Sequence, residues 1–238
     1  MLAENSFPRY SGVLDKELHL PATSKYELTS FIANQIVDWR NNPDRPDRDG
    51  ETILTEHLCS YLNSAVYYSE AWSHIQFQPE TSDETNVGRK IDLTAKPRAA
   101  KIIIEGRRHT QFDSLFPIEC KRLPTPKQKN RDDREYVVTR NGTTGGIQRF
   151  KYGHHGASHK FAAMIAYIQD RDAQHWKAAV NSWIDDLAKE QNTVWSNSDH
   201  LAEINLEVNS DVSCLQSIHN RTDGLDDVEI RHLWIQMN

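Results

Sequence analysis

The segment Phe116-Pro117-Ile118-Glu119-Cys120-Lys121 alternates apolar and charged residues toward its end, as a half-buried strand does. Successive side chains of a strand point to opposite faces, so Phe116, Ile118 and Cys120 would share one face. Glu119 and Lys121 would then lie together on the opposite face. We therefore predict a strand over residues 116–121 that is anchored by apolar side chains and displays a carboxylate beside an ammonium group.

A second segment, Arg89-Lys90-Ile91-Asp92-Leu93-Thr94, repeats this alternation. On a strand Ile91 and Leu93 point one way and Asp92 points the other. If the two strands are close in one sheet, Asp92 and Glu119 can meet. The pattern therefore predicts two carboxylates and one lysine at a single site.

Two carboxylates beside a lysine suit the hydrolysis of a phosphodiester bond. This reaction requires neutralised phosphate charge, an activated water and a stabilised leaving oxygen, all of which a carboxylate-bound Mg²⁺ can supply. Mg²⁺ prefers oxygen ligands and usually takes one or two protein carboxylates, which Asp92 and Glu119 would provide. Lys121 would orient the attacking water or hold the scissile phosphate. We expect an Mg²⁺-dependent reaction, with Mn²⁺ as a substitute; the alternative is an exposed Glu-Lys pair on an ordinary strand.

Periodicity elsewhere in the chain predicts helices before and after these strands. Helical patterns cover residues 23–39, 51–67 and 172–190, with a short helix over 146–152. Further strands are expected over residues 74–78, 89–95, 101–105, 161–168, 212–220 and 228–236. This order predicts an α/β fold with an N-terminal arm over residues 1–22 and a single domain over 23–238, whose core spans about 50–170 and whose C-terminal helix and strands span 172–238.

Further acids compete for a place at the site. On the helix expected over residues 51–67, a period of 3.6 residues directs Glu51 toward the sheet and Glu56 toward solvent. Glu51 is thus a candidate catalytic residue and metal ligand, although the helix dipole alone also favours an acid in the first turn. Glu105, in the segment Ile104-Glu105-Gly106-Arg107, is an alternative to Glu119.

Asp92 followed by Glu119-Cys120-Lys121 resembles the PD-(D/E)XK nuclease superfamily, in which one strand carries the Asp and the next carries (D/E)-x-K. Ile91 stands where the family pattern has a proline. The chain is also similar to nucleases of restriction and phage-defence systems, in which the motif strand is followed by a Gly-Ile-x-Arg-Phe segment like that of residues 146–150.

The resemblance implies a three-layer α/β/α restriction-endonuclease-like core with a central mixed β-sheet. It also implies a DNA endonuclease of a host-defence system that works with a protein partner in a multi-component assembly. Catalysis would involve Asp92, Glu119, Lys121 and Glu51. The metal site would be drawn from Asp92, Glu119, Cys120 and Glu51, although the Cys120 side chain itself is expected in the core.

Charge is unevenly distributed along the chain. The formal net charge is -6, yet residues 121–160 hold ten Lys or Arg against three Asp or Glu, a local +7 that leaves -13 for the rest. This contrast predicts a basic face that suits nucleic acid, with DNA as the expected substrate; a solvated loop at residues 123–146 is the alternative. The candidate nucleic-acid-binding residues, among which Gln148 and Tyr152 match a Q-x-x-x-Y pattern of the resembling nucleases, are Lys127, Lys129, Arg131, Arg134, Gln148, Arg149, Lys151 and Tyr152.

Other features disfavour competing functions. Three widely spaced cysteines fit neither a disulfide framework nor a zinc ribbon, and glycines interrupt the cluster of His154, His155 and His159, which disfavours a helical zinc site. The chain has no apolar run of membrane-spanning length, no export signal and no glycine-rich nucleotide motif. We expect a cytoplasmic protein with no membrane partner. The alternative function is a catalytically inactive nucleic-acid-binding or assembly subunit with a nuclease-like fold.

Overall fold

The computed structural model describes residues 17–127, 131–140, 142–205, 208 and 211–237. Their largest element is a seven-stranded mixed sheet with the order β2-β3-β6-β7-β10-β9-β8. β7 runs parallel to both β6 and β10, whereas the other neighbouring pairs are antiparallel. The strands are β2 (Ile75–Ser82), β3 (Lys90–Pro97), β6 (Phe116–Leu123), β7 (Phe161–Ile168), β8 (Ala202–Glu203), β9 (Val212–His219) and β10 (Val228–Gln236).

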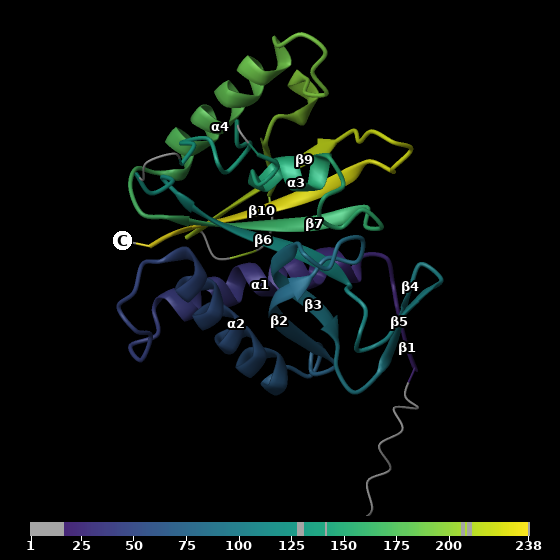
Figure 1. Cartoon of the computed structure of the whole chain (residues 1–238). Helices are drawn as coiled ribbons and strands as arrows, with labels where there is room; N and C mark the ends of the chain where they lie inside the picture. The colour runs from purple at the N-terminus through teal and green to yellow at the C-terminus, as the bar shows by residue number, and fades with distance from the viewer. Residues whose placement is uncertain (1–16, 128–130, 141, 206–207, 209–210, 238) are drawn as a thin grey trace, which may run out of the picture.

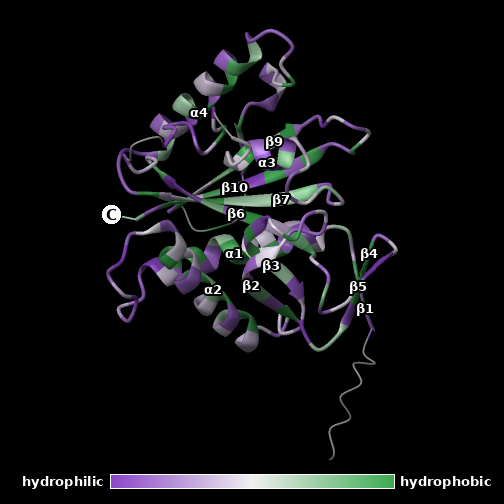
Figure 2. Cartoon of the chain, viewed as in Figure 1, coloured by the Kyte–Doolittle hydropathy of each residue, from purple (hydrophilic) through white to green (hydrophobic). Residues whose placement is uncertain are grey.

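Helices lie on both faces of this sheet (Figure 1). α1 (Ser24–Arg40) and α2 (Glu51–Tyr68) cover one face, and α3 (Gly146–Lys151) and α4 (Ala173–Ala188) cover the other. Each helical layer packs its own apolar cluster against the sheet, and the loops are largely hydrophilic (Figure 2). Because β7 is covered on both faces, all eight of its residues are buried, as its continuous apolar sequence predicts.

Most of the expected elements are confirmed. The helices expected over residues 23–39, 51–67 and 172–190 are α1, α2 and α4, and the expected strands over 74–78, 89–95 and 116–121 are β2, β3 and β6. β8 and the short helix η1 (Asn197–Asp199) were not predicted, because elements of two or three residues carry no readable period. None of the helices among the described residues combines the length and the apolar composition of a membrane span.

The strand expected over residues 101–105 forms outside the main sheet. β4 (Lys101–Ile104) pairs in parallel with β1 (Glu17–Leu20) and antiparallel with β5 (Arg107–His109), which makes a separate three-stranded sheet. β1 lies within the expected arm over residues 1–22, and residues 1–16 are outside the described residues. Because β4 leaves the main sheet, β3 and β6 become direct neighbours.

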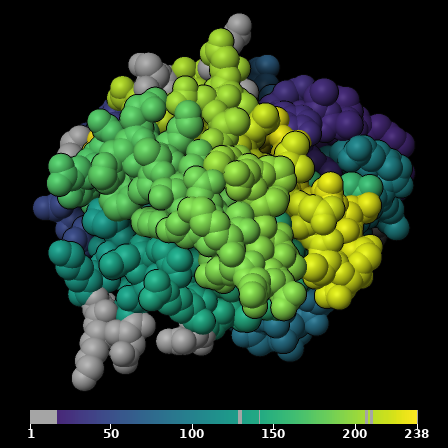
Figure 3. Space-filling model, turned by 90° about the horizontal axis from the view of Figure 1, so that it is seen from above, coloured from purple at the N-terminus to yellow at the C-terminus, as the bar shows by residue number. Residues whose placement is uncertain are grey.

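The segment between β6 and α3 is partly core, so the solvated-loop alternative does not describe all of it. Tyr136, Val137 and Val138 are buried against the α3 and α4 layer. A Cβ atom at Gly145 would lie 2.4 Å from the Cα of Val138, so this close approach requires glycine. Figure 3 shows that α4 and the residues after it spread over the outside of the same layer.

Candidate active site

The adjacent strands β3 and β6 bring Asp92 to the Glu119-Cys120-Lys121 segment. Leu93 lies opposite Ile118 in this antiparallel pair, so Asp92, one residue before Leu93, falls beside Glu119, one residue after Ile118. The Asp92 carboxylate accepts a hydrogen bond from the Cys120 backbone N–H at 2.8 Å. The predicted meeting of the two strands is therefore confirmed.

Lys121 lies among three carboxylates. Its Nζ is 2.9 Å from Glu119 Oε1, 3.3 Å from Glu51 Oε1 and 3.8 Å from Asp92 Oδ2. Burial by itself would lower the pKa of Lys121, but the charges of Glu119, Asp92 and Glu51 outweigh this effect and raise it. Lys121 is therefore a protonated cation at neutral pH and not a general base.

Glu51 reaches the site from the first residue of α2. Its Oε2 accepts a hydrogen bond from the Arg122 backbone N–H at 3.0 Å, and its Oε1 faces Lys121. Glu56, one turn further along α2, is exposed. The predicted helix register is thus confirmed, with Glu51 directed at the sheet and Glu56 directed at solvent.

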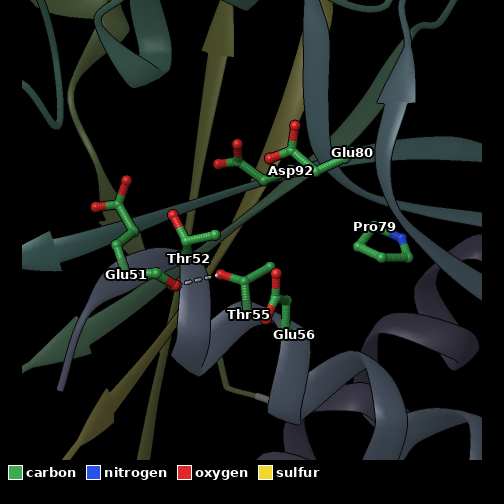
Figure 4. Close-up of a pocket in the computed structure, with 7 residues that line it drawn as sticks. All are labelled: Glu51, Thr52, Thr55, Glu56, Pro79, Glu80 and Asp92. Carbon is green, nitrogen blue, oxygen red and sulfur yellow. Dashed lines mark hydrogen bonds between the residues drawn. The ribbon is translucent and has the colours of Figure 1, made fainter. Parts of the chain in front are cut away.

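A small acidic pocket opens between α2 and the β2–β3 edge (Figure 4). Its free volume of about 20 Å³ suffices for one water molecule or an ion of similar size. Figure 4 shows the Asp92 and Glu80 carboxylates side by side above Thr52. The residues that line the pocket are Glu51, Thr52, Thr55, Glu56, Pro79, Glu80 and Asp92.

Asp92 has an unusual protonation equilibrium. Burial raises its pKa to about 7, and the nearby Glu119 charge adds to the effect, whereas Lys121 and the Cys120 N–H oppose it. The nearby positive groups thus leave the Asp92 carboxylate incompletely neutralised. A cation bound in the pocket would favour ionised Asp92.

Glu119 is fully buried and heavily paired. Its Oε1 contacts both Lys121 and Arg149, and its Oε2 lies 3.3 Å from His155 Nδ1. Burial would raise the pKa of Glu119, but Lys121, His155 and Arg149 outweigh burial and lower it to about 2. Within the described residues, Glu119 Oε2 and His155 Nδ1 are buried without a hydrogen bond of good geometry.

Sequence reasoning missed His155 at this site, and it also missed Glu80, which lines the pocket. His155 follows α3 in a turn where Gly156 has φ of 60°, and a Cβ atom on Gly156 would lie 2.8 Å from Pro117 of β6. This close packing brings His155 against Glu119. The only feature visible in the sequence was a histidine near two glycines, and this feature did not indicate which residue His155 would contact. His159 instead faces Glu84 at 3.3 Å, so the two histidines do not converge on one metal.

Glu105, the alternative acid, is excluded from this site. It lies exposed between β4 and β5 of the smaller sheet, 3.4 Å from Lys25. Glu105 therefore does not take the place of Glu119 beside Lys121.

The predicted nucleic-acid-binding residues have different environments. Lys127 is exposed, and Lys129 lies outside the described residues. Arg131 pairs with Glu135 and lies 3.9 Å from Glu51, while Arg134 lies 3.6 Å from Asp132. Acidic neighbours thus neutralise much of the charge on this segment.

Two of the four nucleic-acid-binding candidates in and just after α3, Gln148 and Lys151, are buried. The Gln148 side chain accepts hydrogen bonds from the Thr139 and Gly145 backbone N–H groups. Lys151 is 1% exposed and pairs with Asp199 at 2.8 Å. Tyr152 is half-buried and stacks on His154, and Arg149 contacts Glu119.

The oxygen donors of the pocket fit Mg²⁺ in chemistry and in number. Mg²⁺ needs only one or two protein carboxylates and keeps several waters, and Glu51 and Asp92 line the same pocket. Across the described residues, no group of three or more His, Cys, Asp or Glu side chains is arranged to hold a metal ion. The Cys120 thiol lies in the core, as expected, and burial raises its pKa, so the sulfur is not a suitable ligand.

Comparison with known proteins assigns no family to this arrangement. No protein-family model matches the chain, and no curated protein or solved structure matches it either.

Proposed function

We propose that this protein is an Mg²⁺-dependent nuclease of the PD-(D/E)XK type, with a restriction-endonuclease-like core. The observation that carries the proposal is the convergence of Asp92, Glu119, Lys121 and Glu51 from two adjacent strands and one helix. The helices on both faces of a mixed sheet also agree with the implied core.

The proposed roles follow from the charges at the site. Glu51 and Asp92 would hold Mg²⁺, with Glu119 as the third candidate. The bound ion would neutralise phosphate charge and activate water. Lys121, which keeps its proton, would hold the scissile phosphate or orient the attacking water through its N–H groups. Arg149 would hold Glu119 in place, or move from it to a phosphate oxygen.

The proposed substrate is DNA, and the proposed setting is a host-defence system with a protein partner. Both rest on the resemblance of the motif strand and of residues 146–150 to restriction and phage-defence nucleases. The proposed phosphate contacts are Lys127, which is exposed, and Arg131, which lies 3.9 Å from Glu51.

A catalytically inactive nucleic-acid-binding subunit is the second candidate. It is favoured by the pairing of Glu119 Oε1 with both Lys121 and Arg149, which leaves this oxygen engaged.

A cleavage assay separates the two candidates. The purified protein would be incubated with plasmid, linear double-stranded and single-stranded DNA, each with Mg²⁺, Mn²⁺ or EDTA. We expect cleavage that needs the metal and is abolished by Asp92→Asn and by Glu119→Gln. Glu105→Gln is the matched control, because this carboxylate lies in the smaller sheet. DNA binding without cleavage under every condition would favour the inactive subunit.

A further inference from the structure

A continuous series of short hydrogen bonds crosses the core on the α3 side of the sheet. Trp234 Nε1 lies 2.8 Å from Tyr136 Oη, which lies 2.7 Å from His232 Nδ1. Ser217 Oγ joins His232 Nε2 at 2.8 Å to His219 Nε2 at 2.7 Å. We name this series, whose members are all at most 2% exposed, the buried chain; it comprises Trp234, Tyr136, His232, Ser217, His219, Asp199 and Lys151.

The buried chain ends in an ion pair. His219 Nδ1 lies 2.7 Å from Asp199 Oδ1. Lys151 Nζ donates to Asp199 Oδ1 at 2.8 Å and to Oδ2 at 3.0 Å. Burial would raise the pKa of Asp199, but His219 and Lys151 outweigh it and lower the pKa, so the carboxylate is ionised. Asp199 therefore only accepts hydrogen bonds.

The accepting carboxylate determines the donor at each following bond. His219 must donate from Nδ1 to Asp199, and burial lowers the pKa of His219, so the neutral ring accepts at Nε2. The Ser217 hydroxyl then donates to His219 and accepts from His232 Nε2–H. His232 is also held neutral by burial, so its Nδ1 accepts.

The opposite end leads to the same assignment. An indole N–H can only donate, so Tyr136 Oη accepts from Trp234 and uses its own hydrogen toward His232 Nδ1. The reverse direction would have His232 Nδ1 donate to Tyr136. The Tyr136 hydrogen would then have no acceptor among the contacts of the described residues, at a buried position where an unmade bond is costly.

Residues of the buried chain, and the residues next to Tyr136, bind both the first and the last turn of α3. The backbone carbonyls of Glu135, Tyr136 and Val137 accept from the first N–H groups of α3, at 2.9, 3.1 and 2.9 Å. Lys151 is the last residue of the helix. Arg149 lies between these two attachments and contacts Glu119 of the candidate active site.

We propose that the buried chain holds α3 in position, so that Arg149 stays against Glu119. In this arrangement His219 is fixed as the Nδ1–H tautomer and His232 as the Nε2–H tautomer. The effect of the buried chain on catalysis rests on the proposed nuclease function, whereas the tautomers and the anchoring of α3 do not. Ser217, His219 and Asp199 are not a hydrolytic triad, because the Ser217 hydroxyl is 2% exposed and bonded on both sides.

Nitrogen NMR of histidine-labelled protein tests the tautomers without any substrate. Long-range proton–nitrogen spectra at neutral pH should show a proton on Nδ1 of His219 and on Nε2 of His232. His219→Gln and His232→Gln variants would assign the signals. The opposite tautomer at either ring, or a doubly protonated ring, would overturn the assigned direction.

Amide hydrogen exchange tests the anchoring of α3. Tyr136→Phe removes one hydroxyl and keeps the ring, so exchange at Gly146, Ile147 and Gln148 should become about tenfold faster. The matched control is Thr29→Val, which removes a buried hydroxyl of α1 that bonds to Lys25. Unchanged exchange in α3, or an equal increase in both variants, would refute the anchoring. If Tyr136→Phe does not fold, Ser217→Ala gives the same test at the centre of the buried chain.

The catalytic consequence needs an active enzyme. Tyr136→Phe should lower kcat by about tenfold or more and change KM less, because basic residues outside α3 still contact the substrate while Arg149 and Glu119 lose their alignment. A fall in stability with unchanged kcat would limit the buried chain to a structural role and refute its effect on catalysis. A wild-type protein that cleaves nothing would instead refute the proposed function, with the NMR and exchange results still deciding the rest.

Discussion

Lys121 Nζ lies 2.9 Å from Glu119 Oε1, so the lysine and the carboxylate of one strand form a buried ion pair that faces α2. The same ammonium group reaches Glu51 at 3.3 Å. Lys121 therefore links β6 to α2 through ion pairs. Glu119 and Glu51 need a nearby cation to stay ionised away from water.

Replacing Lys121 should test this dependence. Lys121→Met would remove the cation that Asp92 and Glu119 share and leave Glu119 with Arg149, so we expect the free energy of unfolding to fall by about 3 kcal/mol. Mg²⁺ should restore part of the loss if the pocket binds it. Urea denaturation with Mg²⁺ or EDTA measures both effects. Lys25→Met, which breaks the remote pair with Glu105, should not respond to Mg²⁺.

The helix acids should differ in their effect on the metal requirement. Glu51→Gln removes a charge that lines the pocket and faces Lys121, so it should lower the cleavage rate and raise the Mg²⁺ concentration for half-maximal activity. Glu56→Gln should have a smaller effect, because Glu56 also lines the pocket but is exposed, whereas Glu51 in addition contacts Lys121. A titration of activity against Mg²⁺ compares them. A shifted requirement in the Glu56 variant alone would show that the wrong acid has been chosen.

Asp92 should make the protein less stable at higher pH. Its folded pKa of about 7 exceeds the usual 3.8, so folding takes up a proton between these values and stability falls as pH rises through them. Asp92→Asn should therefore raise the free energy of unfolding at pH of about 8 by on the order of 1–2 kcal/mol, and change it little at pH of about 4. Urea denaturation in EDTA measures this difference.

Asp132→Asn is the control of opposite sign. Burial would raise the pKa of Asp132, but hydrogen bonds from the Arg134 and Arg140 backbone lower it. Ionised Asp132 therefore stabilises the fold above its unfolded pKa, and that contribution is lost as pH falls. The variant should be less stable than wild type at pH of about 8. A loss of stability by Asp92→Asn at the same pH would contradict the raised pKa.

Lys127 and Lys151 should separate DNA binding from stability. Lys127→Ala should weaken DNA binding and reduce the salt dependence of log affinity by about one unit, because an exposed lysine releases a counterion at phosphate. Lys151→Met should leave that slope unchanged and lower the free energy of unfolding by about 3 kcal/mol, because it strands buried Asp199. Binding measured over a salt series, together with urea denaturation, compares the two. A weaker salt dependence of DNA affinity in the Lys151 variant would show that Lys151 contacts DNA after all.

Local pattern was sufficient for the main elements and for part of the site. The alternation in residues 89–94 and 116–121 predicted the faces of Asp92, Glu119 and Lys121, because a strand fixes side-chain direction at every step. The helical period placed Glu51 toward the sheet for the same reason. These features depend on neighbours only a few residues away.

Only the tertiary structure decided which strands are neighbours and which polar groups meet. The departure of β4 into a second sheet puts β3 beside β6, and strand order is not encoded in any local period. His155 reaches Glu119 through the turn at Gly156, across 36 residues of chain, and Lys151 pairs with Asp199 across 48. The sequence alone shows that Lys151 carries a charge. Only the fold shows that this charge is buried against Asp199, a residue far away in the sequence, because an ionised group removed from water needs a partner within the fold.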